Sequence, residues 1–129
     1  MDSKIEQYNE LLKAILPEEI FTYFEIIKVE VQEQAINVYL DEFNLPPQAY
    51  GNLKLISKGF YPSVTVQDFP IRERAVYFHV RRRKWQVEST GEIVSNTWDT
   101  TAKGTRYTKG FAAFLKEVFG QSPDKQPKS

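Results

Sequence analysis

The sequence has no cysteine and only one histidine, His79, among its 129 residues. Without cysteine the chain cannot form disulfides, iron–sulfur clusters, thiol nucleophiles or cysteine-based zinc sites. A single histidine also excludes a multi-histidine metal site. We therefore expect no metal and no cofactor. We also expect no catalytic activity, because the spacing of the carboxylates predicts no convergent cluster and the sequence offers no recognisable nucleophile–base pair.

The sequence lacks a long apolar run, and it opens with the polar segment MDSKIEQYNE. These features predict neither a signal peptide nor a membrane span, so we expect a cytoplasmic protein. The hydrophobic fraction of 41% and the charged fraction of 26% are typical of a soluble globular domain. The length predicts one domain over residues 1–120 and a disordered tail or linker stub over residues 121–129.

The charges balance overall, with 17 basic and 17 acidic side chains, but they are segregated along the chain. Residues 1–50 hold three lysines against ten acids, a net charge of −7, whereas residues 51–120 hold twelve basic and six acidic side chains, a net charge of +6. Such asymmetry is typical of a chain whose basic half binds a polyanion. It is equally compatible with two halves that pack against each other.

Apolar periodicity predicts helices at the start of the chain and a hairpin after them. Helical spacing indicates an amphipathic helix over residues 3–15 and a second short helix that begins at Pro17. The pattern then changes to period two, which indicates an antiparallel hairpin over residues 25–40. This alternation places Ile27, Val29 and Val31 on one side of the first strand.

The rest of the pattern completes an α+β fold. A short strand is expected around residues 64–67, and a longer strand over residues 75–85 returns through residues 91–98 as a second hairpin. Residues 106–119 form an amphipathic C-terminal helix that ends at Gly120. We expect two N-terminal helices, two antiparallel hairpins forming one small sheet, and the C-terminal helix packed on that sheet.

The segment IRERAVYFHVRRRKW is the most informative part of the sequence. Residues 72–84 contain six cations against the single acid Glu73. On a strand, alternate residues share a face. We therefore expect one row to enter the core with residues of the C-terminal helix (Val76, Phe78, Val80, Phe111, Phe114 and Leu115). The other row is expected to lie outside, with Arg81 and Arg83 exposed (Tyr77, His79, Arg81, Arg83 and Trp85).

This outer row mixes aromatic rings with guanidinium groups, which suit base stacking and phosphate contact. The helix start around Lys103–Thr108 is a second place where a phosphate could bind. Two alternatives stay open. A basic strand end can be a solvated edge, and Tyr77 and Trp85 can pair across strands with Val94 and Trp98. The candidate DNA contacts are Arg72, Arg74, Tyr77, His79, Arg81, Arg82, Arg83, Lys84, Trp85, Lys103, Arg106 and Lys109.

Several long segments resemble the N-terminal region of ISAon-type insertion-sequence transposases. They are LPEEIFTYFEI, LDEFNLPPQAY, LISKGFYPSVTVQDFPIRERAVYFHVRRRKW and AKGTRYTKGFAAFLKEVF, and together they span nearly the whole chain. A more distant similarity is to the zinc-bearing N-terminal segment of ISL-type transposases, carried here by Asp68-Phe69-Pro70 and Arg81-Arg82-Arg83. The cysteine pair of that segment is replaced by Trp85-Gln86-Val87-Glu88, which implies a metal-free, ribbon-like second hairpin.

The resemblance implies a role at the ends of bacterial mobile elements. In such transposases the N-terminal part recognises DNA, while a separate ribonuclease-H-like domain cuts and joins strands. The chain would then be a non-catalytic DNA-binding module, separately encoded or split off, with transposon ends as its partner. The alternative is a protein-interaction subunit that docks a separate transposase catalytic subunit through its acidic first half, without contacting DNA.

Overall fold

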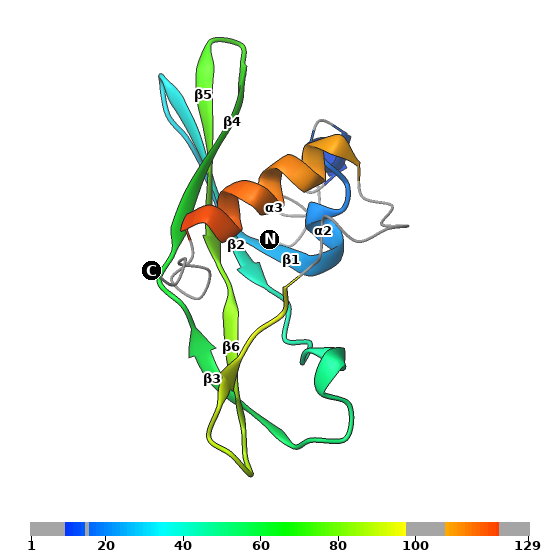
Figure 1. Cartoon of the computed structure of the whole chain (residues 1–129). Helices are drawn as coiled ribbons and strands as arrows, with labels where there is room; N and C mark the ends of the chain where they lie inside the picture. Colours follow the sequence, from blue (N-terminus) through cyan, green and yellow to red (C-terminus); the bar gives the residue numbers. More distant parts are fainter. Residues whose placement is uncertain (1–9, 15, 98–107, 122–129) are drawn as a thin grey trace.

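The computed structural model describes residues 10–14, 16–97 and 108–121. The fold is α+β, with short helical segments before the strands and one longer helix after them (Figure 1). Residues 10–14 are helical. Within the described residues no helix combines the length and apolar character needed to cross a membrane. The remaining elements are α2 (Ile20–Tyr23), β1 (Phe24–Val31), β2 (Ala35–Glu42), η1 (Gln48–Tyr50), β3 (Leu55–Phe60), β4 (Val64–Ile71), β5 (Arg74–Arg81), β6 (Arg83–Val87), β7 (Ile93–Val94) and α3 (Lys109–Gln121).

The strands form two sheets and not the single small sheet expected. The larger sheet has the order β1-β2-β5-β4, and the smaller has the order β3-β6-β7. The predicted hairpins β1–β2 and β6–β7 are confirmed. The sequence pattern did not reveal strand β3, the hairpin pairing of β4 with β5, or the parallel pairing of β2 with β5. Parallel strands are joined by a long connection, so no short turn between them indicates the pairing in the sequence.

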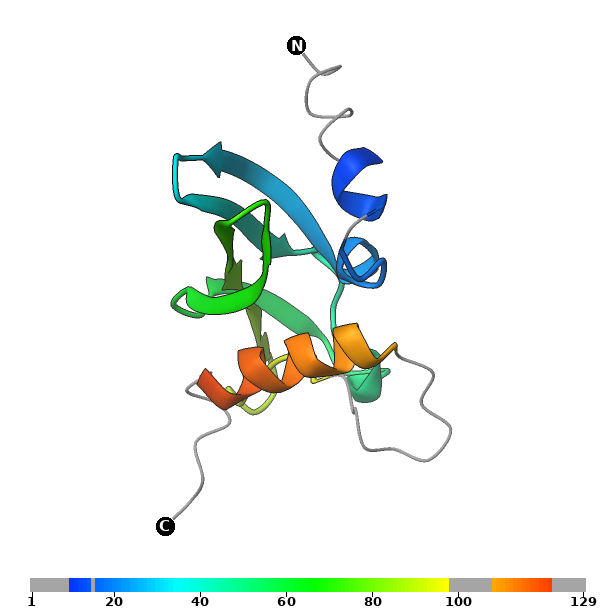
Figure 2. The same cartoon turned by 90° about the horizontal axis from the view of Figure 1, so that it is seen from above.

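The main core lies between the larger sheet and α3. Figures 1 and 2 show α3 lying across one side of this sheet. Phe78 of β5 meets Phe114 of α3 edge to face, with ring centroids 5.7 Å apart. All six residues predicted to share the core are buried in it (Val76, Phe78, Val80, Phe111, Phe114 and Leu115). This part of the sequence interpretation is confirmed.

The expected alternation on β1 is interrupted by a bulge. The pairing with β2 shifts between Ile26 and Lys28, which leaves Ile27 between two paired residues. A bulge adds one residue to one strand and changes the face on which the following side chains lie. Consequently Ile27 is 50% exposed, while Ile26 and Val29 pack against the core. The prediction that Ile27 shares a buried side with Val29 and Val31 is wrong.

Strands β5 and β6 form one extended run that passes from the larger sheet to the smaller at Arg82. Up to Arg82 the even-numbered residues are buried, but beyond it the odd-numbered Trp85 and Val87 are buried. The set of alternate residues that is buried therefore changes from even to odd numbers where the chain passes from one sheet to the other. Trp85 enters a second, small core with Val87 and Val94, opposite its cross-strand partner Val94. The expectation that Trp85 continues the outer row is wrong, whereas its expected pairing with Val94 is confirmed.

Candidate nucleic-acid interface

Three members of the predicted outer row lie on β5. Tyr77, His79 and Arg81 alternate with the buried Val76, Phe78 and Val80, so they point to the side of the larger sheet opposite α3. All three are partly exposed. This sheet face therefore presents aromatic and cationic side chains together, as the sequence predicts.

His79 belongs to a polar network on that face. Its ring stacks on Tyr39 of the neighbouring strand, with centroids 4.6 Å apart. Its Nε2 lies 2.7 Å from Asn37 Oδ1 and its Nδ1 lies 3.2 Å from Thr65 Oγ1. Because Asn37 Oδ1 only accepts, Nε2 carries a hydrogen, and the Thr65 hydroxyl can adapt to the state of Nδ1. Both ring nitrogens are thus engaged in holding three strands together.

Tyr39 extends this network to β1. Its hydroxyl donates to Glu30 Oε1 over 2.9 Å, and Lys28 pairs with Glu30 Oε2 over 3.0 Å. The Lys28 ammonium beside Glu30 lowers the pKa of that carboxyl, and the hydrogen bond to Glu30 raises the pKa of Tyr39. Lys28 and Glu30 of β1 therefore compensate each other, and the cations of this face lie further along β5 and β6.

Arg81 is fixed by Asp41 of β2. Its Nε and Nη2 donate to the two carboxylate oxygens over 2.7 and 2.6 Å, a bidentate pair. The hydrogen bonds to Asp41 raise the pKa of the Arg81 guanidinium. The Arg81 side chain nevertheless remains 43% exposed, against 10% for that of Asp41. The pair leaves Nη1 unused, so Arg81 can still offer a donor at the surface.

Phe60, the last residue of β3, and Tyr61, which follows it, contact the cations at the junction of the two sheets. The guanidinium carbons of Arg81 and Arg83 lie 4.1 and 4.5 Å from the centre of the Phe60 ring. The ammonium of Lys84 lies 5.6 Å from the centre of the Tyr61 ring. These distances are those of cation–π contacts. We call this cluster of Phe60, Tyr61, Arg81, Arg83 and Lys84 the cation–aromatic ridge.

Arg82 lies buried between Tyr61 and α3, with its guanidinium carbon 5.6 Å from the centre of the Tyr61 ring and 4.9 Å from that of Phe119. It is 2% exposed, and its Nη2 donates to Ser95 Oγ and to the Asn96 carbonyl. The neighbouring Glu42 is also 2% exposed; it accepts the Arg83 backbone N–H over 2.8 Å and Asn96 Nδ2 over 2.7 Å. Burial raises the pKa of the Glu42 carboxyl. Arg82 is therefore buried at a polar junction and Trp85 in the smaller core, which corrects their expected placement at the DNA-contacting surface.

Some acidic side chains of the first half of the chain contact basic residues of the second half within the molecule. Asp41 and Glu42 belong to the acidic first half, and they meet Arg81 and Arg83 of the basic second half. The Arg83 Nε also donates to the Glu42 carbonyl over 2.9 Å. The two interpretations of the charge pattern are therefore not exclusive, since the basic strand is half covered and half exposed.

Arg72 and Arg74 lie at the other end of β5. Arg72 and Glu73 form the β4–β5 turn with φ values of 52° and 70°. Arg74 Nε donates to the Gln32 carbonyl, which ties this turn to the β1–β2 turn. Nine residues of extended chain separate Arg74 from Arg83, on the order of 30 Å. The two arginines at the tip are therefore not part of the ridge.

The start of α3 is occupied by a carboxylate of the chain itself. Glu19 accepts the backbone N–H and the hydroxyl of Thr108 over 2.8 and 3.0 Å, and the Thr108 hydroxyl caps the helix by accepting from Phe111 N. Although partial burial acts to raise it, these bonds hold the pKa of Glu19 below its usual value. Lys109 is exposed there. Lys103 and Arg106 lie outside the described residues.

The sequence interpretation missed the acceptors and rings that organise the basic strand. Asp41, Glu42, Phe60 and Tyr61 come from segments that are distant in sequence, and no spacing rule connects them to Arg81. The word-like similarity around LDEF and KGFY was the only available signal. Across the described ranges, no group of three or more acidic, histidine or cysteine side chains is arranged to hold a metal ion.

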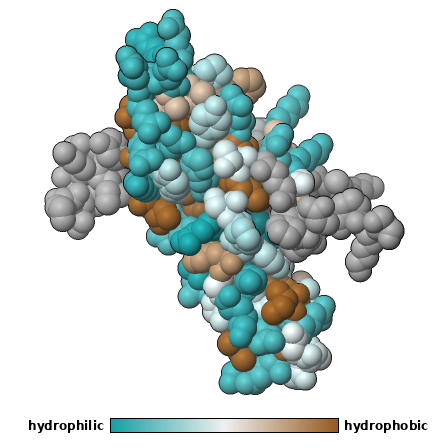
Figure 3. Space-filling model, turned by 90° about the vertical axis from the view of Figure 1, so that its left-hand side faces the viewer, coloured by the Kyte–Doolittle hydropathy of each residue, from teal (hydrophilic) through white to brown (hydrophobic). Residues whose placement is uncertain are grey.

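Comparisons of the chain with protein-family models, curated proteins and solved structures give no match. The functional argument therefore depends on the residues themselves. Figure 3, which views the molecule from the left of Figure 1, shows hydrophilic side chains covering the strand tips at the top and hydrophobic side chains in separate patches lower down.

Proposed function

We propose that the chain is a non-catalytic DNA-binding module of the kind found at the N-terminus of insertion-sequence transposases, and that it contacts DNA through the cation–aromatic ridge. The observation that carries the proposal is the stacking of Arg81 and Arg83 on one ring, Phe60. The sequence resemblance to such transposases supports the same conclusion, and it assigns strand cleavage and joining to a different domain.

The geometry of the ridge suits phosphate contacts. Lys58 lies in the bulge between the Ser57–Trp85 and Phe60–Arg83 pairs, next to Lys84. Four cations in this region (Lys58, Arg81, Arg83 and Lys84) outnumber its carboxylates, which are Asp41 at Arg81, the buried Glu42 at Arg83, and Glu25 opposite Asp41 on β1. Guanidinium groups already held by a ring and a carboxylate lose little freedom when a phosphate binds.

We assign positioning on the DNA backbone, and not base readout, to these residues. Arg83 and Lys84 provide the uncompensated charge, and Arg81 adds its remaining donor. Phosphate contacts fix the orientation of a protein on a duplex and carry no sequence information themselves. Arg72 at the β4–β5 turn is exposed and could reach a second stretch of the same duplex, whereas the helix start at Thr108 is already filled by Glu19.

The test is fluorescence anisotropy with two labelled duplexes, one carrying an insertion-sequence end and one scrambled, over a salt series. Lys84→Glu should weaken binding at least tenfold and lower the salt slope by about 1 to 2, since each phosphate contact contributes about 0.9 to the slope. Lys13→Glu is the matched control, because it makes the same charge change at an exposed helical position away from the ridge.

If Lys84→Glu and Lys13→Glu weaken binding equally, only the net charge of the protein matters for DNA binding. That result would contradict the assignment of the contact to the ridge. Preference for the end sequence would identify a recognition module, and equal binding to both duplexes would identify a positioning surface. Failure to bind either duplex at low salt would refute the DNA proposal.

A further inference from the structure

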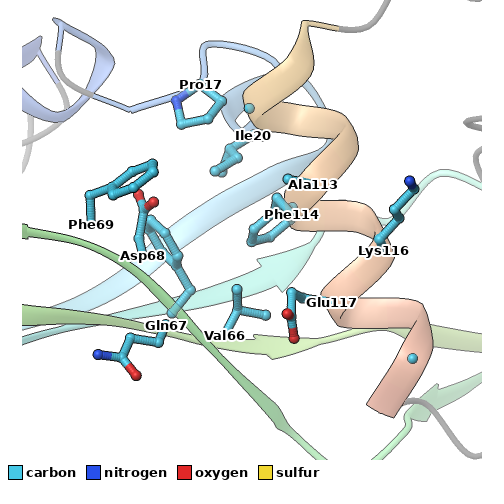
Figure 4. A pocket seen from close by; sticks show the side chains of 13 residues that line it. Pro17, Ile20, Val66, Gln67, Asp68, Phe69, Ala113, Phe114, Lys116 and Glu117 are labelled. Atoms are coloured by element: carbon cyan, nitrogen blue, oxygen red, sulfur yellow. The ribbon is translucent and has the colours of Figure 1, made fainter.

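A groove of about 950 Å³ lies between β4 and α3, away from the ridge (Figure 4). Its floor consists of apolar side chains, including Ile20, Val66 and Phe114. Pro17 closes one end, where its ring lies 3.1 Å from the position that a Cβ on Gly110 would occupy. The groove is thus formed by four separate parts of the chain, with an apolar floor and polar and charged side chains along its rim.

The rim exposes a large aromatic side chain beside an open strand edge. Phe69 on β4 is 85% exposed, more than any other large hydrophobic residue described. Strand β4 is at the end of the larger sheet, so one of its edges has no neighbouring strand among the described residues. Pro70 near the end of β4 limits further pairing to the stretch before it. An exposed aromatic rim on an open edge is typical of a surface that adds a strand from a partner.

The charges on the two walls favour a basic partner. Asp68 on β4 and both Lys116 and Glu117 on α3 line the groove, so its rim carries two carboxylates and one ammonium group, a net negative charge (Figure 4). Two carboxylates beside an apolar channel attract a lysine or arginine flanked by apolar side chains. They repel phosphate, so this groove does not suit a nucleic acid.

We propose that this groove binds an extended segment of a partner protein, in which apolar side chains enter the channel and a flanking lysine or arginine pairs with Asp68 or Glu117. The segment would add a strand to the open edge of β4, giving main-chain affinity, while the apolar channel selects its side chains. The proposal is independent of DNA binding, because the ridge and the groove share no residue.

The test is selection of a phage-displayed library of random 12-residue peptides on the full chain, followed by binding titration of the enriched peptides in synthetic form. We expect enriched sequences to carry apolar residues next to lysine or arginine. Glu117→Lys should weaken their binding at least tenfold. The matched control is Glu92→Lys, the same charge change at an exposed position between β6 and β7 that does not line the groove, which should leave binding within about twofold.

A second variant tests the channel itself. Ala113 is exposed on α3 and lines the groove, so Ala113→Trp should fill the channel and abolish binding while circular dichroism shows the fold intact. The proposal is overturned by acidic enriched sequences, by equal binding to Glu117→Lys, or by the absence of any enrichment. A concentration-dependent dimer that Ala113→Trp abolishes would also overturn it, because a second copy would then fill the groove.

Discussion

The two sheets of this protein are held together by different physical means. The larger sheet buries fifteen residues in one cluster under α3, whereas the smaller sheet buries only Trp85, Val87 and Val94 beside Tyr50 and Leu55. A cluster of three side chains is too small to stabilise a sheet independently. The smaller sheet therefore depends on the continuous β5–β6 run and on the buried polar junction of Glu42, Arg82 and Asn96.

This difference explains the position of the ridge. The ridge lies where β5 becomes β6, so its cations sit on the segment that both sheets share. Acceptors on the larger sheet orient Arg81 and Arg83, and the Phe60 ring at the end of β3 covers both. The larger sheet thereby positions the proposed binding surface at its junction with the smaller one. Five substitutions test this comparison.

The largest effect is expected from Phe78→Ala in the main core. Phe78 is 1% exposed and meets Phe114 edge to face. Removing a buried phenyl group costs about 3 to 5 kcal/mol of unfolding free energy. Urea denaturation followed by circular dichroism should show both sheets unfolding together at the lower midpoint. A loss below about 1 kcal/mol would contradict the assignment of the main core.

The next effect is expected at the junction. Glu42→Ala leaves the Arg83 N–H without its acceptor beside the buried Arg82, whereas Asn96 Nδ2 keeps its bond to the Leu45 carbonyl. An unsatisfied buried donor costs about 1 to 3 kcal/mol, so we expect a loss of about 2 kcal/mol. DNA binding should change less, because the Arg83 side chain bonds to the backbone carbonyl of Glu42, which the substitution keeps. Unchanged stability in urea would show that the two sheets hold together without this residue.

Val94→Ala should destabilise the smaller sheet more than the molecule as a whole. It removes buried methyl groups opposite Trp85, worth about 2 kcal/mol. Native-state hydrogen exchange should become faster for amides of β3, β6 and β7, with little change in β2 and β5. Equal acceleration in both sheets would remove the distinction between them.

The smallest effect is a contrast in pH dependence between two carboxyls. Burial raises the pKa of Glu42, so the folded state holds the proton more tightly than the unfolded chain. The stability of the natural chain relative to Glu42→Gln should therefore fall as pH rises from about 4.5 through that raised pKa. Thermal melts between pH 4 and pH 7 measure this difference.

Glu19 should show the opposite sign. Its pKa is lowered by the hydrogen bonds from Thr108, although partial burial opposes this. The stability of the natural chain relative to Glu19→Gln should therefore be present above about pH 4.5 and be lost as pH falls through the lowered pKa. If the stability difference from the natural chain changed with pH in the same direction for Glu42→Gln and Glu19→Gln, the contrast between a buried junction and an exposed helix cap would be contradicted.

The sequence predicted the class of the fold and the residues of the main core, because both follow from period-two and helical spacing on single elements. The sequence did not predict the burial of residues whose environment depends on two elements together. Trp85 turned inward because β5 passes into another sheet at Arg82, and Ile27 turned outward because of a bulge. Neither event changes the local alternation of apolar and polar residues.

The candidate site was predictable to a similar extent. The row from Tyr77 to Arg83 avoids the main core as expected, but Arg81 and Arg83 are half-buried and not exposed as predicted, because Asp41 and Phe60 cover them. The counter-charges on β2 and the rings after β3 could not be predicted, since the parallel β2–β5 pairing brings together residues about forty positions apart. The segregation of charge indicated that the acidic and basic halves of the chain could pack against each other, but it could not identify which residues form the ion pairs.

The measurement that tests the DNA-binding proposal most directly is a titration of isotope-labelled protein with duplex DNA, followed through the amide signals. We expect the largest chemical-shift changes at the amides of residues 58–61 and 81–84. These signals should be in fast exchange and should broaden as the salt concentration is lowered. The groove residues Phe69 and Glu117 should stay unchanged. Shifts centred on β4 and α3, or a uniform response over the whole surface, would contradict DNA binding at the cation–aromatic ridge.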